Sequence, residues 1–248
     1  MNESILKAAS DHALAEYPRE ACGLVIVRNG RQIYRRCINR ATSPEDHFVI
    51  DANDFAIAED AGEIVALVHS HPDGRARPSE ADRVSCEASG LKWTILSVMP
   101  GEEGPYVAEV FELEPEGYEA PLVGRPFHHG VLDCYSVVRD WYARERGIAL
   151  PNFERRDGWW DDGHSNLYLD HFREAGFEPV GQYPKDLEAG DVILMQIRSR
   201  NRVPNHAAVY LGDGRMLHHM AGRLSSVDVY GGMWREATIL VVRRGAGS

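Results

Sequence analysis

The chain has 248 residues, of which 44% are hydrophobic and 26% charged, a composition typical of folded proteins and unlike that of disordered chains. Its 27 basic and 38 acidic side chains give a net charge of −11, which argues against a general nucleic-acid coat or a binder of anionic membranes. The acidity belongs to the first half: residues 1–120 carry 11 basic and 22 acidic side chains, whereas residues 121–248 carry 16 of each. A chain of this length is more easily accommodated in two cores than in one.

The N-terminus lacks a basic start followed by an apolar core, so we expect no signal peptide. No apolar run approaches the roughly 18–20 residues that span a bilayer. The four cysteines include no Cys-x-x-Cys pair, which excludes a four-thiolate zinc site and argues against a disulfide framework. We therefore expect synthesis in a reducing cytoplasm, with Cys22, Cys37 and Cys86 as core or half-buried thiols.

The first half carries short alternations of helical and extended patterns. In chain order the apolar spacing predicts a helix over 3–17, strands at 22–27, 32–38 and 48–50, a helix over 53–60, a strand at 63–68, a helix over 79–89, and strands at 93–99 and 106–113. Asn29 and Gly30 form a turn signal between the first two strands, which predicts a hairpin. These elements predict a compact α/β domain with a mixed sheet.

Residues 114–126 concentrate proline, glycine and charge without periodicity, as a linker does. We set the predicted domains at 1–118 and 119–248. In the second half the order is helices over 133–146 and 166–175, then strands at 192–196, 207–211, 215–219 and 238–243. Helices followed by strands predict an α+β domain, so the whole chain is predicted to be a two-domain α/β and α+β protein.

Two histidines end the apolar strand at 63–68. His69 and His71 are two residues apart, so both imidazoles project to the same side, and Asp82 in the next helix offers a third ligand. Three protein ligands leave a fourth position open for water, as catalytic zinc sites require. Glu20, just before the first strand, is a candidate general base, and Ser79 a candidate helix cap and oxyanion donor. Taken alone, His-x-His is more often a surface loop.

The order and spacing of these residues resemble the JAMM (MPN-domain) metalloprotease signature. Glu20 stands in Glu-Ala-Cys-Gly-Leu, and the run from His69 to Asp82 reads His-x-His-Pro-x(6)-Ser-x-x-Asp. The resemblance covers about residues 1–115 and implies an MPN-like mixed sheet with helices. It implies a Zn²⁺ ion held by His69, His71 and Asp82, with Glu20 as base and Ser79 as oxyanion partner. It supports hydrolysis of amide or isopeptide bonds and names no substrate.

The second half contains a cysteine at a helix start. Cys134 falls in the first turn of a predicted helix, where unpaired amides and the helix dipole favour the thiolate. A strong turn signal separates the strands at 207–211 and 215–219. If the residue numbers of paired residues in this hairpin add to an even number, His206 and His218 share one face and His219 lies on the other. His206 would then deprotonate Cys134, and His218 would orient His206. Taken singly, free cysteines and strand histidines are usually structural.

These residues together resemble the NlpC-type peptidases, papain-like enzymes of cell-wall turnover. The matching features are Asp133-Cys134 at a helix start, a Gly190-Asp191 strand entry, Asn-His-Ala-Ala-Val-Tyr-Leu-Gly from residue 205, and a polar residue twelve positions after the histidine. The resemblance covers about residues 124–244 and implies a papain-like α+β fold with Cys134, His206 and His218 as the site.

One feature of that family is missing here. Many NlpC-type relatives carry a tyrosine upstream of the cysteine that helps to shape the oxyanion site, whereas residues 124–130 contain none. We expect the main-chain amide of Cys134 to supply one donor; His128 and His129 are the candidates to replace the tyrosine, and that role stays unassigned.

The two domains, in this order, resemble the tail assembly proteins of lambda-like siphophages. The resemblance implies a tail-tip protein with peptidoglycan-peptide hydrolase activity, made in the host cytoplasm, carried in the virion tail tip and acting at the cell wall. The implied partners are peptidoglycan peptides and other tail-tip proteins, with no nucleic acid and no membrane insertion. Two alternatives stay open: a structural scaffold with occluded sites, and a maturation protease acting on other tail proteins.

Overall fold

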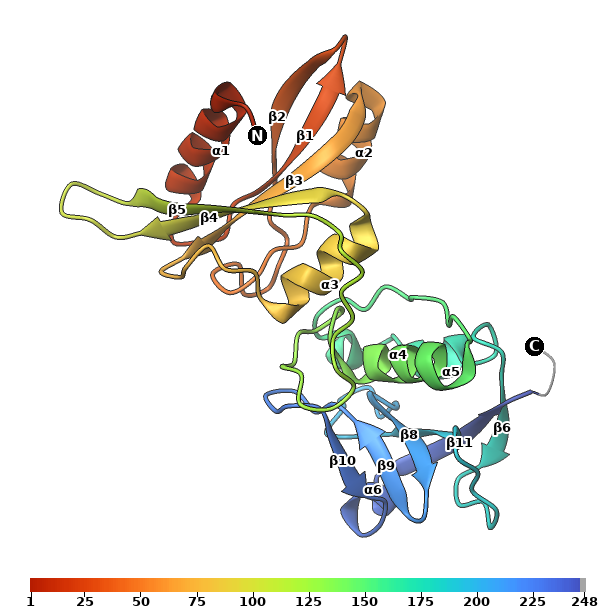
Figure 1. Cartoon of the computed structure of the whole chain (residues 1–248). Helices are drawn as coiled ribbons and strands as arrows, with labels where there is room; N and C mark the ends of the chain where they lie inside the picture. The colour runs from red at the N-terminus through yellow and green to blue at the C-terminus, as the bar shows by residue number, and fades with distance from the viewer. Residues whose placement is uncertain (246–248) are drawn as a thin grey trace. The chain divides into compact units, whose positions relative to one another are not determined.

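A computed structural model of the chain describes residues 1–245 and divides into two units, Met1–Glu119 and Ala120 onward (Figure 1). Each unit has its own sheet, its own helices and its own apolar core. The predicted two-domain combination of an α/β and an α+β unit is therefore confirmed. Within the described residues, every helix is too short or too polar to cross a bilayer.

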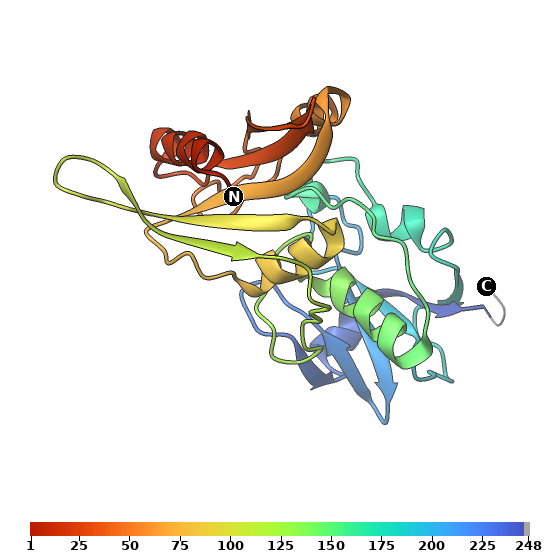
Figure 2. The same cartoon turned by 45° about the horizontal axis from the view of Figure 1, so that its top comes forward.

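The N-terminal unit is built on a five-stranded sheet in the order β2-β1-β3-β4-β5, with β3 and β4 parallel and the other neighbours antiparallel. Its strands are β1 (Cys22–Arg28), β2 (Arg31–Cys37), β3 (Glu63–Pro72), β4 (Lys92–Met99) and β5 (Tyr106–Leu113). Its helices are α1 (Glu3–Glu16), α2 (Ala52–Ala61) and α3 (Glu80–Ser89). α1 covers one face of the sheet, and α2 and α3 cover the other (Figure 1 and Figure 2).

The strand alternation explains this layering. In the interior strand β1, Val25 packs with α1, whereas Leu24 and Ile26 pack in the core beneath α2 and α3, so the strand is buried on both faces. Asn29 and Gly30 take positive φ angles of 51° and 72°, as a tight hairpin turn between β1 and β2 requires.

The strand predicted at 48–50 is wrong, because only an isolated bridge joins Asn39 to Ile50. The side-chain amide of Asn39 hydrogen-bonds backbone groups that would otherwise be free to pair with a neighbouring strand. Its oxygen accepts from the Val49 amide at 3.1 Å, and its nitrogen donates to the His47 carbonyl at 3.1 Å. Phe48 and Ile50 still pack against the core, which explains the apolar alternation in the sequence.

The C-terminal unit contains a six-stranded antiparallel sheet in the order β10-β9-β8-β7-β11-β6. Its strands are β6 (Phe177–Gly181), β7 (Val192–Met195), β8 (His206–Gly212), β9 (Arg215–His218), β10 (Ser226–Val229) and β11 (Thr238–Arg244). Its helices are α4 (Cys134–Arg146), α5 (Leu167–His171) and α6 (Met233–Glu236), with a 3₁₀ turn, η1 (Trp159–Asp161). Apolar side chains of α4 pack across β7, β8 and β9 and hold the N-terminus of α4 at one end of the sheet.

Several elements of this unit differ from the prediction, and the short helix α6 was not predicted. The helix predicted at 166–175 ends at His171, because the Phe177 amide bonds back to the Phe172 carbonyl and turns the chain into β6. β6 and β10 were missed: both lie at edges of the sheet, where β6 tolerates a proline and β10 exposes Val227 and Val229. The five residues of β6 include a proline and a glycine, and the four residues of β10 alternate over too short a run to predict a strand.

Candidate functional site

Two strand positions and one helix start converge in the N-terminal unit. His69 and His71 occupy alternate positions of β3, and Asp82 lies in the first turn of α3. The Nε2 atoms of the two histidines are 3.0 Å apart, and they lie 3.3 Å and 3.4 Å from the carboxylate oxygens of Asp82. The three predicted ligands thus form one compact cluster of donors suited to a metal ion.

The spacing of these donors fits zinc. Zinc–nitrogen and zinc–oxygen bonds of about 2.0–2.2 Å in a tetrahedral shell put neighbouring ligand atoms roughly 3.3–3.6 Å apart, close to the observed separations. The Nδ1 atom of His71 lies 2.9 Å from the Arg75 carbonyl, so Nδ1 carries the hydrogen and Nε2 is free to coordinate. Burial lowers the pKa of His69, which favours the neutral imidazole that a metal needs.

Glu20 joins this cluster from the segment just before β1. β1 pairs Cys22 with His69, and the amide of Ser70 donates to the Ala21 carbonyl at 3.0 Å, so the same register carries Glu20 opposite His71. The Glu20 side chain is buried, and burial raises its pKa to about 8; His71 opposes this shift and Asp82 adds to it. Glu20 is therefore a buried carboxyl beside the donor cluster.

Ser79 caps α3. Its hydroxyl accepts from the Asp82 amide at 3.1 Å, and its own amide donates to Oδ2 of Asp82 at 2.7 Å, which completes a capping box. The cap orients Asp82 toward the histidines. Ser79 is itself exposed, and its hydroxyl hydrogen stays available to a ligand.

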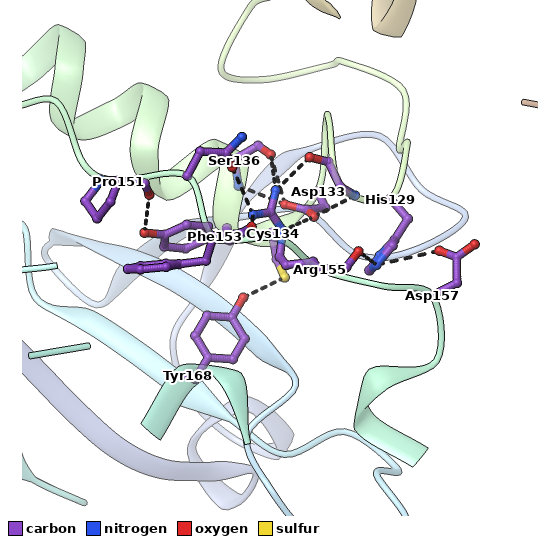
Figure 3. Close-up of polar contacts among 12 residues, drawn as sticks. His129, Asp133, Cys134, Ser136, Pro151, Phe153, Arg155, Asp157 and Tyr168 are labelled. Atoms are coloured by element: carbon purple, nitrogen blue, oxygen red, sulfur yellow. Dashed lines mark hydrogen bonds and ion pairs between the residues drawn. The ribbon is translucent and has the colours of Figure 1, made fainter. Parts of the chain in front are cut away.

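In the C-terminal unit, Cys134 is the first residue of α4. Asp133 caps the helix by accepting from the Ser136 amide at 2.8 Å and from the Gly130 amide at 2.9 Å. The hydroxyl of Tyr168, from α5, lies 3.1 Å from the Cys134 sulfur and points straight at it (Figure 3). The sulfur is thus hydrogen-bonded to the Tyr168 hydroxyl and to the backbone of Ala207, next to His206.

Arg155 lies at the centre of this end of the unit (Figure 3). Its side chain, buried by Asp133 and the loop before η1, donates to the Asp133 carboxylate at 2.7 Å and to the carbonyls of Gly130 and Phe153 at 2.8 Å and 2.6 Å. Burial opposes ionisation of Asp133, but Arg155 outweighs it and leaves the Asp133 pKa lowered. Arg155 thereby balances the negative charge next to Cys134.

The thiol differs from the sequence expectation. Burial raises the pKa of Cys134 to about 11 and Asp133 adds to the shift, while the Tyr168 hydroxyl opposes it. Burial also lowers the pKa of His206 to about 3. The helix start by itself therefore does not hold a thiolate, and at neutral pH the thiol and the imidazole are both uncharged.

The predicted histidine pair is present. β8 pairs Ala208 with His218 of β9, an even sum, so His206 and His218 share a face and His206 Nε2 lies 3.0 Å from His218 Nδ1. Trp234 of α6 packs on both rings, with centroid distances of 6.1 Å and 4.6 Å. Both histidines are buried, so water is largely excluded from the bond between them.

Cys134 and His206 open into one pocket of about 230 Å³. Its walls are rich in aromatic rings, including Trp159 and Trp160 of η1, and Trp160 meets the ring of His129 edge-on at 5.5 Å. His129 is held by the Arg155 carbonyl at 3.0 Å. An aromatic pocket that ends at a thiol and an imidazole suits a peptide or another ligand with apolar surface.

Comparison with known proteins places both units in families. Residues 2–110 match the family of prokaryotic homologs of the JAB domain, and residues 124–243 match the NlpC/P60 family. The tail tip assembly protein K of Escherichia phage N15 is 37% identical over 98% of this chain and 95% of its own, and that of Escherichia phage lambda is 44% identical over 75% and 84%. The chain belongs to the tail tip assembly protein K family.

Membership of the protein K family confirms the resemblance to phage tail assembly proteins and the order of the two domains. Among solved structures, a lipoprotein-like NLP/P60 family protein from Staphylococcus aureus is 18% identical, covers 49% of this chain and 37% of its own, and has a TM-score of 0.35. That value is too low to carry an argument about the fold.

Two residues near Cys134 in this member of the protein K family, Tyr168 and Arg155, were not predicted from the sequence as parts of the site. Tyr168 lies 34 positions after the cysteine, in a segment whose apolar spacing indicated only a helix. Arg155 lies in a loop without periodicity. Neither position carries a local signal, because both meet Cys134 only through the packing of α5 and the loop before η1 onto the start of α4.

The Tyr168 contact leads to a first prediction. Tyr168→Phe removes the hydroxyl and keeps the ring, so we expect turnover of a peptide substrate to fall by about 10- to 100-fold, the cost of roughly 1.4–2.7 kcal/mol for a lost hydrogen bond to a charged group. The loss should appear in kcat with little change in KM. Tyr183→Phe, which removes the hydroxyl of an exposed tyrosine in the same unit, is the matched control. Equal kcat for the two variants would contradict a role for Tyr168.

Proposed function

We propose that this tail tip assembly protein carries two hydrolase sites: a cysteine peptidase that cuts peptides of peptidoglycan, and a JAMM-type zinc site that cuts amide or isopeptide bonds. Its proposed place is the virion tail tip, after assembly in the host cytoplasm, and its action is at the bacterial cell wall. The observation that carries the proposal is the hydrogen bond between His206 and His218, at the pocket that contains Cys134. The pairing gives the thiol an oriented base.

At the cysteine site the sulfhydryl proton of Cys134 passes to His206, and the sulfur attacks the carbonyl carbon of the scissile peptide bond. The imidazolium of His206 returns that proton to the leaving amine as the carbon–nitrogen bond breaks. His206 then takes a proton from water, whose oxygen displaces the sulfur and releases a carboxylic acid, and His206 returns the proton to the displaced sulfur to restore the thiol. Because both resting groups are uncharged, proton transfer accompanies attack rather than preceding it.

The oxyanion formed on attack needs donors. The main-chain amide of Cys134, at the start of α4, supplies one. The Tyr168 hydroxyl, 3.1 Å from the sulfur, is placed to supply a second as the carbonyl oxygen develops charge. In this proposal Tyr168 fills the place of the tyrosine that is missing upstream of the cysteine.

In the N-terminal unit His69, His71 and Asp82 would hold zinc, which supplies a Lewis acid that activates water and polarises the scissile carbonyl. Glu20 takes the proton of the attacking water and delivers it to the leaving amine. The Ser79 hydroxyl donates to the carbonyl oxygen while its cap contacts hold Asp82 in position. The complete donor set supports chemistry over a purely structural role.

A maturation protease acting on other tail proteins is the second candidate, because a JAMM-type site suits isopeptide and amide bonds in folded proteins. We propose to separate the two by incubating purified sacculi, and separately tail proteins, with the full chain and identifying the products by mass spectrometry. The expected result is soluble muropeptides with newly cut stem peptides, absent when Cys134→Ala is used. Cleaved tail proteins with intact sacculi would favour the maturation protease, and no cleavage of either would favour a scaffold.

A further inference from the structure

The second histidine of the site has a partner of its own. His218 Nε2 lies 2.9 Å from Oδ2 of Asp228, and this carboxylate is the next polar group beyond the two histidines. His218 is buried, with 2% of its side chain exposed, whereas 40% of the Asp228 side chain is exposed. Asp228, which is partly exposed to solvent, is thus one end of a chain of hydrogen bonds through His218 to His206, and His206 lines the pocket of Cys134.

The sheet register places these three side chains in a line. His218 of β9 is paired with Ala208 of β8 on one side and with Ser226 of β10 on the other. His206 lies two residues before Ala208, and Asp228 lies two residues after Ser226, so both are on the same face of the sheet as His218. Along the strands they are displaced from His218 in opposite directions. Because β8, β9 and β10 are neighbours in the sheet (Figure 1), the line crosses the three strands diagonally.

We propose that Asp228 is a positioning residue of the cysteine site, which fixes the tautomers of His218 and His206 so that Nδ1 of His206 accepts the proton of Cys134. The inference rests on the proposed peptidase function. A carboxylate only accepts hydrogen bonds, so in the neutral imidazole of His218 the single hydrogen sits on Nε2 and Nδ1 is bare. That bare nitrogen accepts from Nε2 of His206, whose own Nδ1 is then left without a hydrogen.

The opposite tautomer would block the reaction. If Nδ1 of His218 carries the hydrogen, Nε2 of His206 must accept it. The hydrogen of the neutral His206 ring then sits on Nδ1 of His206, and that nitrogen cannot accept the thiol proton. In the arrangement that Asp228 selects, the thiol proton moves to Nδ1 of His206 and no other proton moves. The imidazolium donates through Nε2 to a neutral His218, and the Asp228 charge stabilises it.

The test compares Asp228→Asn with Asp213→Asn. Asp213 is an exposed acid in the turn between β8 and β9, with a φ of 52° that asparagine adopts readily, so the control removes the same charge without touching the histidines. The readouts are the pH dependence of Cys134 alkylation by iodoacetamide, with Cys134→Ser as background, and kcat and KM on the stem peptides found in sacculus digests.

For Asp228→Asn we expect alkylation at pH 7 to slow by about 10-fold and the apparent pKa of the thiol to rise by about one unit. We expect kcat to fall by at least about 10-fold with KM unchanged. Asp228→Glu, which restores a carboxylate, should recover most of the alkylation rate. The other charged or titratable groups facing the site are retained in every variant: Asp133, Arg155, Tyr168 and His219.

An alkylation profile of Asp228→Asn that matches Asp213→Asn would overturn the proposal, and so would a loss that Asp228→Glu fails to reverse. The outcome is independent of the substrate assignment. A shifted alkylation profile in a protein that cleaves no peptide would keep the positioning role and reject the peptidase function. Peptide release that survives in Cys134→Ser would reject the cysteine mechanism itself.

Discussion

Replacing Cys134 with alanine is expected to abolish release of soluble muropeptides from sacculi, lowering the rate by at least about 1,000-fold, because alanine has no nucleophilic atom with which to form the acyl intermediate. Folding should be unaffected. The sulfur contacts Tyr168 at the edge of the pocket and is not part of the apolar core beneath α4. Release is measured by mass spectrometry, and folding by circular dichroism and thermal unfolding.

Cys86→Ala provides the matched control for the thiol. Cys86 is a buried cysteine of α3 in the other unit, so this variant loses a thiol without touching the pocket. We expect it to release muropeptides at the wild-type rate, with a small loss of stability from the cavity. If Cys134→Ala released muropeptides like the wild type, the nucleophile assignment would be wrong.

His71→Ala is expected to remove zinc from the N-terminal unit. Freshly purified wild type should contain about one zinc per chain by elemental analysis, and the variant close to none, because loss of a ligand should cost more than the roughly 10- to 100-fold affinity lost with an outer-shell partner. Zinc added to chelator-treated protein should raise the unfolding temperature of the wild type and leave that of the variant unchanged. A wild type that is folded and free of zinc would contradict the metal site.

Glu20→Gln separates metal binding from chemistry at the same site. The glutamine keeps the size of the buried side chain beside His71 but cannot take a proton. We expect full zinc content with hydrolysis of amide or isopeptide substrates reduced by at least about 100-fold. His164→Ala, at an exposed histidine of the other unit, should change neither quantity. Loss of zinc in Glu20→Gln would instead make Glu20 part of the metal shell.

Local spacing was sufficient for much of both sites. An interval of two residues on a strand places His69 and His71 on one side, and an interval of three at a helix start joins Ser79 to Asp82 in a capping box. The same reasoning places Cys134 at a helix start. These relations depend only on the side-chain periodicity of a strand or a helix, which is the same wherever that element forms.

Other relations depended on register. The hairpin of β8 and β9 was predictable because a short turn joins its strands, so the pairing of His206 with His218 followed from an even sum. Asp228 was not, because β10 returns after an irregular segment whose length does not specify the register. Glu20 meets His71 across two strands far apart in sequence, and only the resemblance to JAMM proteins suggested it.

The sequence by itself determined that there are two domains with different motifs, that the excess acidity belongs to the first, and which side chains begin and end each local motif. Only the tertiary structure decided that Tyr168 and Arg155 surround Cys134, that Asp228 extends the histidine pair, and that the thiol is uncharged at rest. The reason is physical. Backbone periodicity acts over a few residues, whereas burial and charge balance are sums over every group that packing brings near the sulfur.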